Sequence, residues 1–352
     1  MTSSVPSFVV SLLVALVLGT PAVTLEAQSR ATGALPSATI AAPDSALLGE
    51  AYARARALPR LRSLLIHRRG SLVREHYFRG ATRAQAANIK SASKSVIATL
   101  VGIAIARGEI RDVRQPISEL LPEATRDLDA RKRAITVDDL LTMRAGLQST
   151  SFENYGSWVS SRNWVRDALR RPMVADPGGP MIYSTGSTHL LSAILTRATG
   201  MSTHRYAQRV LARPMGIPLR AWTTDPQGIY FGGNEMRMTP REMVAFGRLF
   251  LNGGRAPNGT AVVRKAWIDS SWVRRTRSGW SDQEYGYGWW IRRSGAHDVY
   301  FAWGYGGQFI FVVPTLDLVV VTTSDPSATT RERGHLDAIH DILDTAIVPA
   351  LR

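Results

Sequence analysis

Ser91 and Lys94 stand three residues apart at the head of an apolar run, a spacing that can place both side chains on one face of a helix. Only four of the 43 basic Lys and Arg residues are lysines: Lys90, Lys94, Lys132 and Lys265. Arginine keeps its proton at ordinary pH, whereas a desolvated lysine can lose it. Lys94 is therefore a candidate base or proton relay for the Ser91 hydroxyl, although the spacing alone also arises by chance.

The residues after Lys94 indicate the element that positions this pair. Val96 to Ala106 is apolar on all sides and ends at Gly108, which predicts a buried helix whose first turn holds Ser91 and Lys94. At the start of that helix the backbone N–H of Ser91 is unpaired and can form half of an oxyanion hole. The apolar neighbours disfavour the ammonium form of Lys94, so this lysine can take the serine proton.

Two further segments carry chemistry. Tyr183-Ser184-Thr185 stands directly before a predicted helix, and a tyrosine held beside a cation can relay protons. The run from Trp303 to Gln308 contains three glycines and leads into a predicted strand, where a substrate can approach the backbone and one N–H can complete the oxyanion hole. The candidate catalytic residues are Ser91, Lys94 and Tyr183, and the candidate substrate-binding or oxyanion residues are Thr185, Trp303, Gly304, Gly306 and Gly307.

The predicted elements change in type along the chain. Leu61–His67 and Leu72–Phe78 flank Arg69-Gly70, which is the pattern of a hairpin. The middle third is mainly helical: one helix opens at Ile135, a second spans His189–Ala198, and a third runs from the Thr239–Glu242 capping box through Leu251. Strands are then predicted at Tyr285–Ile291, Val299–Trp303, Gln308–Val313 and Leu316–Thr323, before a closing helix with Leu336, Ile339, Leu343 and Ile347 near one face.

Because strands lie toward both ends of the chain, they must join in one sheet with the helical middle inserted. We therefore predict an α+β fold, in which an antiparallel sheet is flanked by N- and C-terminal helices and carries a mainly helical subdomain. A single domain is expected over residues 46–350, with an α/β part at about 46–85 and 262–350 and a helical part at about 86–261.

Taken together, these motifs resemble the serine β-lactamase and penicillin-binding superfamily. The serine-x-x-lysine signature, the tyrosine loop about ninety residues later and the glycine-bearing strand near the end occur in the same order. The resemblance extends from about Leu61 to Thr323, through Leu140–Leu147 and Gly232–Thr239, and is strongest to the class C-like branch of family VIII esterases, D-amino-acid-releasing peptidases and 6-aminohexanoate-dimer hydrolases. It implies a β-lactamase/transpeptidase-like fold, with Ser91 as the acylated nucleophile, Lys94 as its proton partner and Tyr183 as general base and acid.

Two departures from the family pattern narrow the substrate. Thr185 stands where the tyrosine motif usually ends in asparagine, so no side-chain amide is available there to bind a substrate carbonyl. Trp303 and Gly304 stand where β-lactamases and peptidases have a Lys or His before Thr-Gly, so the usual cation for a substrate carboxylate is missing unless an arginine replaces it. Both changes argue against an efficient β-lactamase and favour the esterase and amide-hydrolase members of the branch.

Composition limits the other possibilities. The chain has no cysteine, which excludes disulfides, thiol catalysis and cysteine-ligated metals. Its net charge of +15 suggests nucleic-acid binding, but the arginines are scattered and no binding motif is present, so we expect no nucleic-acid partner. His335, Asp337 and His340 form no metal motif and are read as a solvated helix face, so no metal or cofactor is expected.

The N-terminal segment predicts export. Phe8 to Leu18 is apolar apart from Ser11, too short to span a bilayer but the right length for the core of a signal peptide. Residues 1–27 are thus a predicted signal peptide, although no Lys or Arg precedes Phe8, and a buried helix is the alternative. Residues 28–45 are read as a flexible leader. The mature chain is expected in the periplasm or outside the cell, with no membrane span.

Three functional hypotheses follow, in order of support. The first is an exported serine hydrolase that cleaves small esters or amides through a Ser91 acyl-enzyme. The second is a penicillin-binding D-Ala-D-Ala carboxypeptidase or β-lactamase. The third is a non-catalytic binding or sensor module on the same fold, because fold alone does not fix function. A Gly-x-Ser-x-Gly motif is absent, which disfavours an α/β-hydrolase triad.

Overall fold

The computed structural model describes residues 48–327 and 332–351. The predicted signal peptide (1–27) and leader (28–45) lie outside the described residues. Within them, eight antiparallel strands form one sheet in the order β2-β1-β10-β9-β8-β7-β6-β5. The strands are β1 (Leu61–Arg68), β2 (Ser71–Tyr77), β5 (Thr276–Arg277), β6 (Glu284–Tyr285), β7 (Trp290–Ser294), β8 (His297–Gly304), β9 (Gln308–Val313) and β10 (Leu318–Ser324). The predicted α+β fold is confirmed, because β1 from the beginning of the chain pairs with β10 from its end.

Local sequence explains the centre of this sheet. Every residue of β9 and β10 is buried, as expected for runs of Val, Ile and Phe that are covered on both faces. The β1–β2 hairpin turns at Arg69 and Gly70, which have φ angles of 45° and 80°. Two consecutive positive φ values match the tight hairpin turn that the sequence predicts there.

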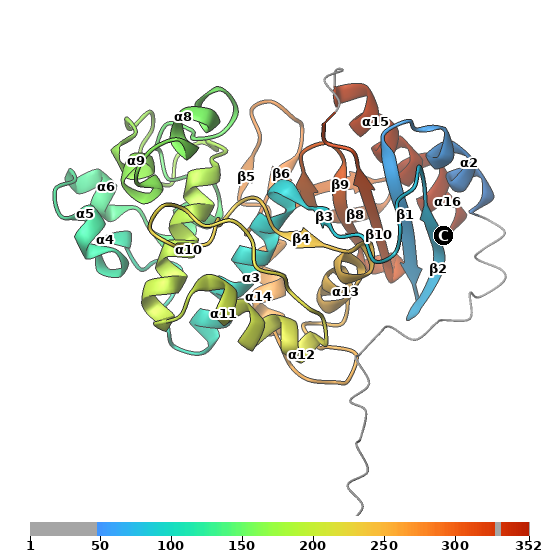
Figure 1. Ribbon diagram of the computed structural model, residues 1–352, viewed down its shortest axis with the longest axis horizontal. Coiled ribbons are helices and arrows are strands. Elements are labelled where there is room, and N and C mark those ends of the chain that lie inside the picture. Colours follow the sequence, from blue (N-terminus) through green and yellow to red (C-terminus); the bar gives the residue numbers. More distant parts are fainter. Residues whose placement is uncertain (1–47, 328–331, 352) are drawn as a thin grey trace, which may run out of the picture. The chain divides into compact units, whose positions relative to one another are not determined.

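Helices cover the two faces of the sheet (Figure 1). On one face α2 and α15, together with the turns that follow α15, bury aromatic and aliphatic residues of β8, β9 and β10. On the other face α13 packs against β9 and β10, and α3 contacts β8. These helices are α2 (Gly49–Ala57), α3 (Ser93–Ala106), α13 (Pro240–Leu251) and α15 (Glu332–Ile342), followed by a π turn at Leu343–Ile347 and α16 (Val348–Ala350).

The inserted helices gather around α10, which packs against α3 (Figure 1). They are α4 (Ile117–Leu120), α5 (Pro122–Thr125), α6 (Ala130–Ala134), α7 (Val137–Leu141), α8 (Tyr155–Val159), α9 (Trp164–Arg170), α10 (Thr185–Thr199), α11 (Thr203–Ala207) and α12 (Arg213–Met215). Helix α14 (Lys265–Ser271) follows α13 in the chain and packs its Trp267 against Gly102 of α3. A short ladder, β3 (Ala87–Asn88) with β4 (Arg237–Met238), joins the segment before α3 to the segment before α13. This ladder therefore fixes the entry to the helix that carries Lys94.

Two sequence-based predictions about the last third are wrong. The strand expected at Tyr285–Ile291 is two strands, β6 and β7, because Gly286 packs against the Ser271 carbonyl and Gly288 has a φ of 75°. The helix face with His335 and His340 is not solvated: His335 is 9% exposed, and His340 packs its ring against three phenylalanines of β8 and β9. The sequence pattern missed this burial because α15 closes over the sheet.

No helix in the described part of the chain is both long enough and apolar enough to cross a bilayer.

Candidate active site

Ser91 lies in a short 3-10 turn (Lys90–Ala92) that leads directly into α3, rather than in the first turn of the α-helix as predicted. Lys90 has a φ of 52°, an unusual value for a residue with a side chain. The Asn88 side chain holds this conformation by accepting the Lys90 N–H at 2.9 Å, and Ile89 donates its N–H to the Met236 carbonyl at 2.9 Å. The nucleophile candidate therefore stands on a tightly fixed, strained turn, as is common at functional sites.

Lys94 is buried one turn further along, with 2% of its surface exposed. Its Nζ donates to Ser91 Oγ at 3.0 Å, to Thr185 Oγ1 at 3.3 Å and to the Gly233 carbonyl at 2.9 Å. None of these partners carries a charge. Burial therefore lowers the pKa of Lys94 from 10.5 to about 7, so that the neutral amine becomes accessible near neutral pH.

Tyr183 completes the group around Ser91. Its hydroxyl hydrogen-bonds Ser91, and Lys94 Nζ lies 5.1 Å from the centre of its ring. Burial raises the pKa of Tyr183 to about 12, and the hydrogen bond with Ser91 offsets part of that rise. Tyr183 is thus a neutral phenol at physiological pH, which can donate or relay a proton but does not start as a phenolate.

Thr185 begins α10 and is 4% exposed. Its hydroxyl contacts Ser151 Oγ at 2.8 Å as well as Lys94, while its N–H donates to Ser151 Oγ at 2.9 Å. The next N–H of the helix, from Gly186, donates to Thr150 Oγ1 at 2.7 Å. Thr185 therefore contacts Lys94 and helps to orient it, while its role in binding a substrate stays a prediction.

The glycine-bearing hairpin lies against the turn that carries Ser91. Gly304 ends β8, and a Cβ atom there would fall 2.0 Å from the Ile89 carbonyl oxygen, so only glycine fits. Gly306 and Gly307 have φ values of 83° and 101° and form the turn into β9. A Cβ on Gly307 would instead meet Ser324 Oγ at 2.7 Å. The structure thus brings Gly304 next to the nucleophile turn, whereas Gly307 packs against β10.

Comparison with known proteins agrees with this geometry. The family model described as Beta-lactamase matches residues 61–343. The chain belongs to that family. A 6-aminohexanoate-dimer hydrolase of Paenarthrobacter ureafaciens is 26% identical in an alignment of 299 positions that covers 76% of this chain and 74% of that enzyme.

Two solved structures illustrate the shared fold. A protein of Bacillus anthracis, provisionally described as a 6-aminohexanoate-dimer hydrolase, superposes with a TM-score of 0.69 at 21% identity, covering 80% of this chain and 79% of that one. EstCE1, a hydrolase with promiscuous acyltransferase activity, superposes with a TM-score of 0.68 at 16% identity, covering 86% of this chain and 98% of that one. The family and the β-lactamase/transpeptidase-like fold predicted from the sequence are therefore confirmed.

In this member of the Beta-lactamase family, the segment Gly232–Glu235 contributes more than the sequence indicated. Gly233 supplies the carbonyl that holds Lys94, and Glu235 accepts from Asn88 at 2.8 Å and from Lys90 at 3.3 Å. The segment therefore supports both the lysine and the turn before the nucleophile. The consecutive glycines were visible in the sequence, but nothing in it showed that a backbone carbonyl there would face Lys94.

An aromatic cluster borders Tyr183. Phe152 and Trp280 come from two different loops and lie 6.1 Å apart, edge to face, and each lies within 6.3 Å of the Tyr183 ring. They are 61% and 51% exposed, although both are large apolar side chains. Trp280 also contacts Trp290 and Trp303, each at 5.5 Å between ring centroids. Trp303, predicted to bind substrate, thus forms part of an apolar surface beside Tyr183.

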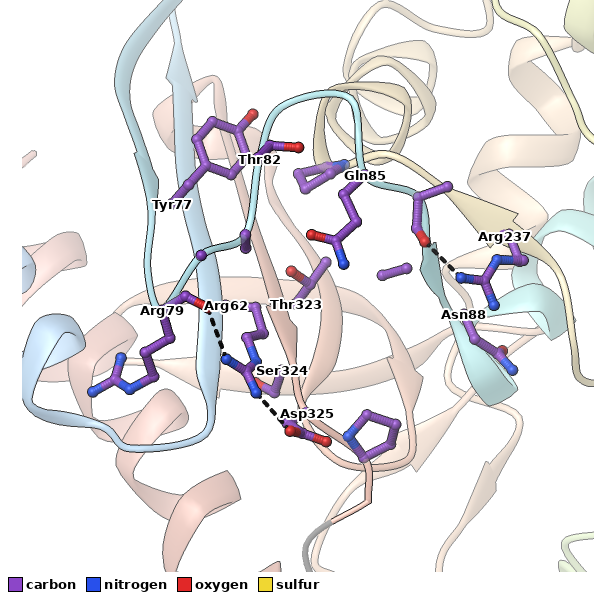
Figure 2. A pocket seen from close by; sticks show the side chains of 16 residues that line it. Arg62, Tyr77, Arg79, Thr82, Gln85, Asn88, Arg237, Thr323, Ser324 and Asp325 are labelled. Atoms are coloured by element: carbon purple, nitrogen blue, oxygen red, sulfur yellow. Dashed lines mark hydrogen bonds and ion pairs between the residues drawn. The ribbon is translucent and has the colours of Figure 1, made fainter.

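A separate pocket of about 460 Å³ opens between the β3–β4 ladder and the ends of β1, β2 and β10 (Figure 2). Three arginines and one carboxylate line it. Arg62 donates to Asp325 Oδ2 at 2.6 Å and to the Arg79 carbonyl at 3.1 Å, and Arg237 donates to the Ala86 carbonyl at 3.0 Å. The arginines of this pocket therefore bind the protein itself.

Proposed function

We propose that this chain is an exported serine hydrolase that cleaves small esters or amides through an acyl-enzyme on Ser91. The observation that carries the proposal is the buried Lys94, whose Nζ lies 3.0 Å from Ser91 Oγ and whose pKa is lowered to about 7. A lysine in this state can remove the serine proton at neutral pH, which an exposed lysine does not do efficiently.

The contacts of Lys94 define the direction of proton transfer. The Gly233 carbonyl can only accept a hydrogen bond, so one N–H of the neutral amine points to it, and the second points to Thr185. The lone pair is then directed at Ser91. As the Ser91 Oγ–carbonyl carbon bond forms, the serine proton passes to Lys94, and the Tyr183 phenol protonates the leaving oxygen or nitrogen as its bond to carbon breaks. In the second half-reaction water attacks the acyl carbon and gives a proton to the Tyr183 phenolate. The Lys94 ammonium returns its proton to Ser91 Oγ as the bond from Ser91 to the acyl carbon breaks, which releases the acid and restores the starting state.

The aromatic surface favours substrates with an apolar part. Phe152, Trp280 and Trp303 lie beside Tyr183, where the sequence lacks the cation that would bind the carboxylate of a penicillin. Apolar groups bind such surfaces because their contact releases water from both. The name of the Paenarthrobacter relative, 6-aminohexanoate-dimer hydrolase, supports an amide substrate, because the dimer of an amino acid is joined by an amide bond.

The proposal is tested by replacing Ser91 with alanine and measuring hydrolysis of p-nitrophenyl acyl esters. Ser91→Ala should reduce turnover by about 10,000-fold or more, because no other group can form the acyl-enzyme. Ser93→Ala is the matched control: Ser93 Oγ is buried two residues away without a hydrogen-bond partner, so this variant should keep its activity. Unchanged hydrolysis in Ser91→Ala would refute the proposal.

Mass spectrometry of the intact protein after incubation with esters, short amides and penicillins would identify the acyl group and the modified residue. Stable labelling of Ser91 by a fluorescent penicillin would favour the penicillin-binding alternative. Failure of a fluorophosphonate probe to label Ser91 would favour a non-catalytic module. Export is tested separately by sequencing the N-terminus of the mature protein, which should begin after residue 22 or 27 if the predicted segment is cleaved.

A further inference from the structure

A second pair of polar side chains is buried next to the lysine site without contacting Ser91 or Lys94. The side chains of His189 on α10 and of Asp225 on the loop between α12 and β4 are both fully buried, and His189 Nε2 lies 3.0 Å from Asp225 Oδ2. The rings of Trp158, Trp164 and Phe231 surround the imidazole at 5.4–5.9 Å. A buried acid and base are costly to maintain in an apolar setting, so their hydrogen bonds must be specific.

These hydrogen bonds fix the tautomer of His189. The backbone N–H of Gly232 donates to His189 Nδ1 at 3.4 Å, so Nδ1 carries a lone pair and no proton. In the neutral imidazole Nε2 must then carry the proton and donate it to Asp225. The other carboxylate oxygen, Oδ1, accepts the N–H groups of Gln227 at 2.8 Å and Ile229 at 2.9 Å. Each polar atom of the pair therefore has one fixed role.

The His189–Asp225 pair is linked to Lys94 through the backbone of Gly232 and Gly233. A Cβ atom on Gly232 would fall 2.1 Å from the Thr188 carbonyl oxygen, so this residue has no room to move toward α10. Its neighbour Gly233 places its carbonyl 2.9 Å from Lys94 Nζ, and a Cβ there would lie 3.0 Å from the same nitrogen. A displacement of Gly232 is therefore transmitted directly to the acceptor that orients Lys94.

We propose that His189 and Asp225 are positioning residues for the hydrolase: by holding Gly232 they aim the Gly233 carbonyl at Lys94. The proposal rests on the proposed function, because it assigns the lysine a catalytic role. Neither residue touches the reacting atoms. Two other titratable groups lie nearby. Glu235, the nearest acid along this segment, pairs with Lys90, and the Tyr183 ring lies beside Lys94 Nζ. Neither of them takes the place of the Gly233 carbonyl as the acceptor for Lys94.

Asp225→Asn tests the tautomer directly. In this variant the oxygen must remain opposite the N–H groups of Gln227 and Ile229, so the amide NH₂ faces His189 Nε2. The histidine must then accept at Nε2 and carry its proton on Nδ1, where it opposes the Gly232 N–H. We expect kcat/KM to fall about tenfold, since the Gly233 carbonyl no longer orients the amine.

The decisive readout is the titration of Lys94, followed by NMR on protein with labelled lysine side chains. The chain contains four lysines, and Lys94→Arg assigns the signal of interest. Loss of the carbonyl contact destabilises the ammonium, so Asp225→Asn should lower the Lys94 titration midpoint by about half a pH unit. Ser192→Ala is the matched control, because Ser192 is equally buried on α10 and bonds the Tyr230 carbonyl at 2.6 Å but not Gly232.

An unshifted Lys94 midpoint in a folded Asp225→Asn protein would overturn the proposal, as would an equal shift in Ser192→Ala. If Asp225→Asn does not fold, the ¹⁵N signals of His189 in the unaltered protein decide: a proton on Nε2 supports the arrangement, and a proton on Nδ1 contradicts it. Neither measurement uses a substrate. A failure of the proposed function in Ser91→Ala is therefore distinguishable from a failure of this positioning role.

Discussion

Two polar regions of this protein use their positive charges in opposite ways. In the pocket of Figure 2 the cations are arginines, which bind Asp325 and backbone carbonyls at a surface open to solvent. Around Ser91 the cation is Lys94, which is 2% exposed and contacts two hydroxyls and a carbonyl. The arginines keep their charge at ordinary pH, whereas burial lowers the pKa of Lys94 to about 7.

The difference shows that burial, rather than a neighbouring charge, lowers the pKa of Lys94. Its lowered pKa has burial as its cause, whereas the pKa of Asp325 is held below its usual range chiefly by hydrogen bonds from Ser327 and then by Arg62. Arginine keeps its proton and suits a permanent structural charge, whereas a buried lysine such as Lys94 can lose its proton. Each prediction below alters one side of this contrast.

Lys94→Arg should have the largest effect, because it places a guanidinium, the group that lines the pocket of Figure 2, at the buried site. A guanidinium keeps its proton, so it cannot activate Ser91, and its greater bulk also displaces Gly233. We expect kcat for ester hydrolysis to fall about 1,000-fold or more. Lys265→Arg is the control, since Lys265 is exposed and pairs with Asp269, and it should retain full activity. Comparable activity in the two variants would show that Lys94 is not the base.

The pH profile of the unaltered enzyme should show the next largest effect. If neutral Lys94 is the active form, kcat/KM rises with pH and has a midpoint near the Lys94 pKa of about 7. Below that midpoint activity should fall about tenfold per pH unit, because the fraction of neutral amine falls by that factor. Steady-state kinetics between pH 5 and 9 measure the midpoint. A flat profile across pH 7 would contradict the assignment of Lys94 as base.

Substitutions in the aromatic surface should change affinity more than chemistry. Trp280→Ala and Phe152→Ala each remove an exposed ring near Tyr183 but leave Ser91 and Lys94 unaltered. We expect KM for hexanoate esters to rise about five-fold, since apolar contact area is lost, with a smaller change for acetate esters. Comparing the two esters in the same variant separates lost binding from general damage. An equal loss on both would indicate that the rings shape the catalytic group instead.

The sequence was sufficient for those parts of the site that depend on local spacing. Ser91 and Lys94 lie in one turn and the following helix, so their spacing alone brings them together. The hairpin and the capping box before α13 also follow from adjacent residues. The pairing of β1 with β10 could be inferred because strands were predicted toward both ends of the chain.

What the sequence missed depends on contacts between distant segments. The acceptor of Lys94 is a glycine carbonyl 139 residues away, and a carbonyl has no sequence signal of its own. The state of Tyr183 is also set by packing, because burial raises its pKa to about 12 and keeps it a phenol. Likewise nothing in the sequence showed that the Thr185 hydroxyl, at the start of α10, would contact Lys94 and Ser151.

Arg62→Gln should have the smallest effect, and it tests whether the arginine pocket is separate from the active site. Arg62 and Asp325 are each about one-third exposed, so solvent screens their ion pair and the loss of unfolding free energy should be about 1 kcal/mol or less. Because the Asp325 pKa is lowered in the folded state, this contribution is present above pH 4 and disappears as the carboxylate is protonated in acid. Thermal unfolding of the variant and the unaltered protein at pH 7 and pH 3 measures the loss of unfolding free energy and its dependence on pH. Ester hydrolysis should be unchanged. A tenfold loss of activity would instead place the pocket within the substrate site and remove the contrast between the two regions.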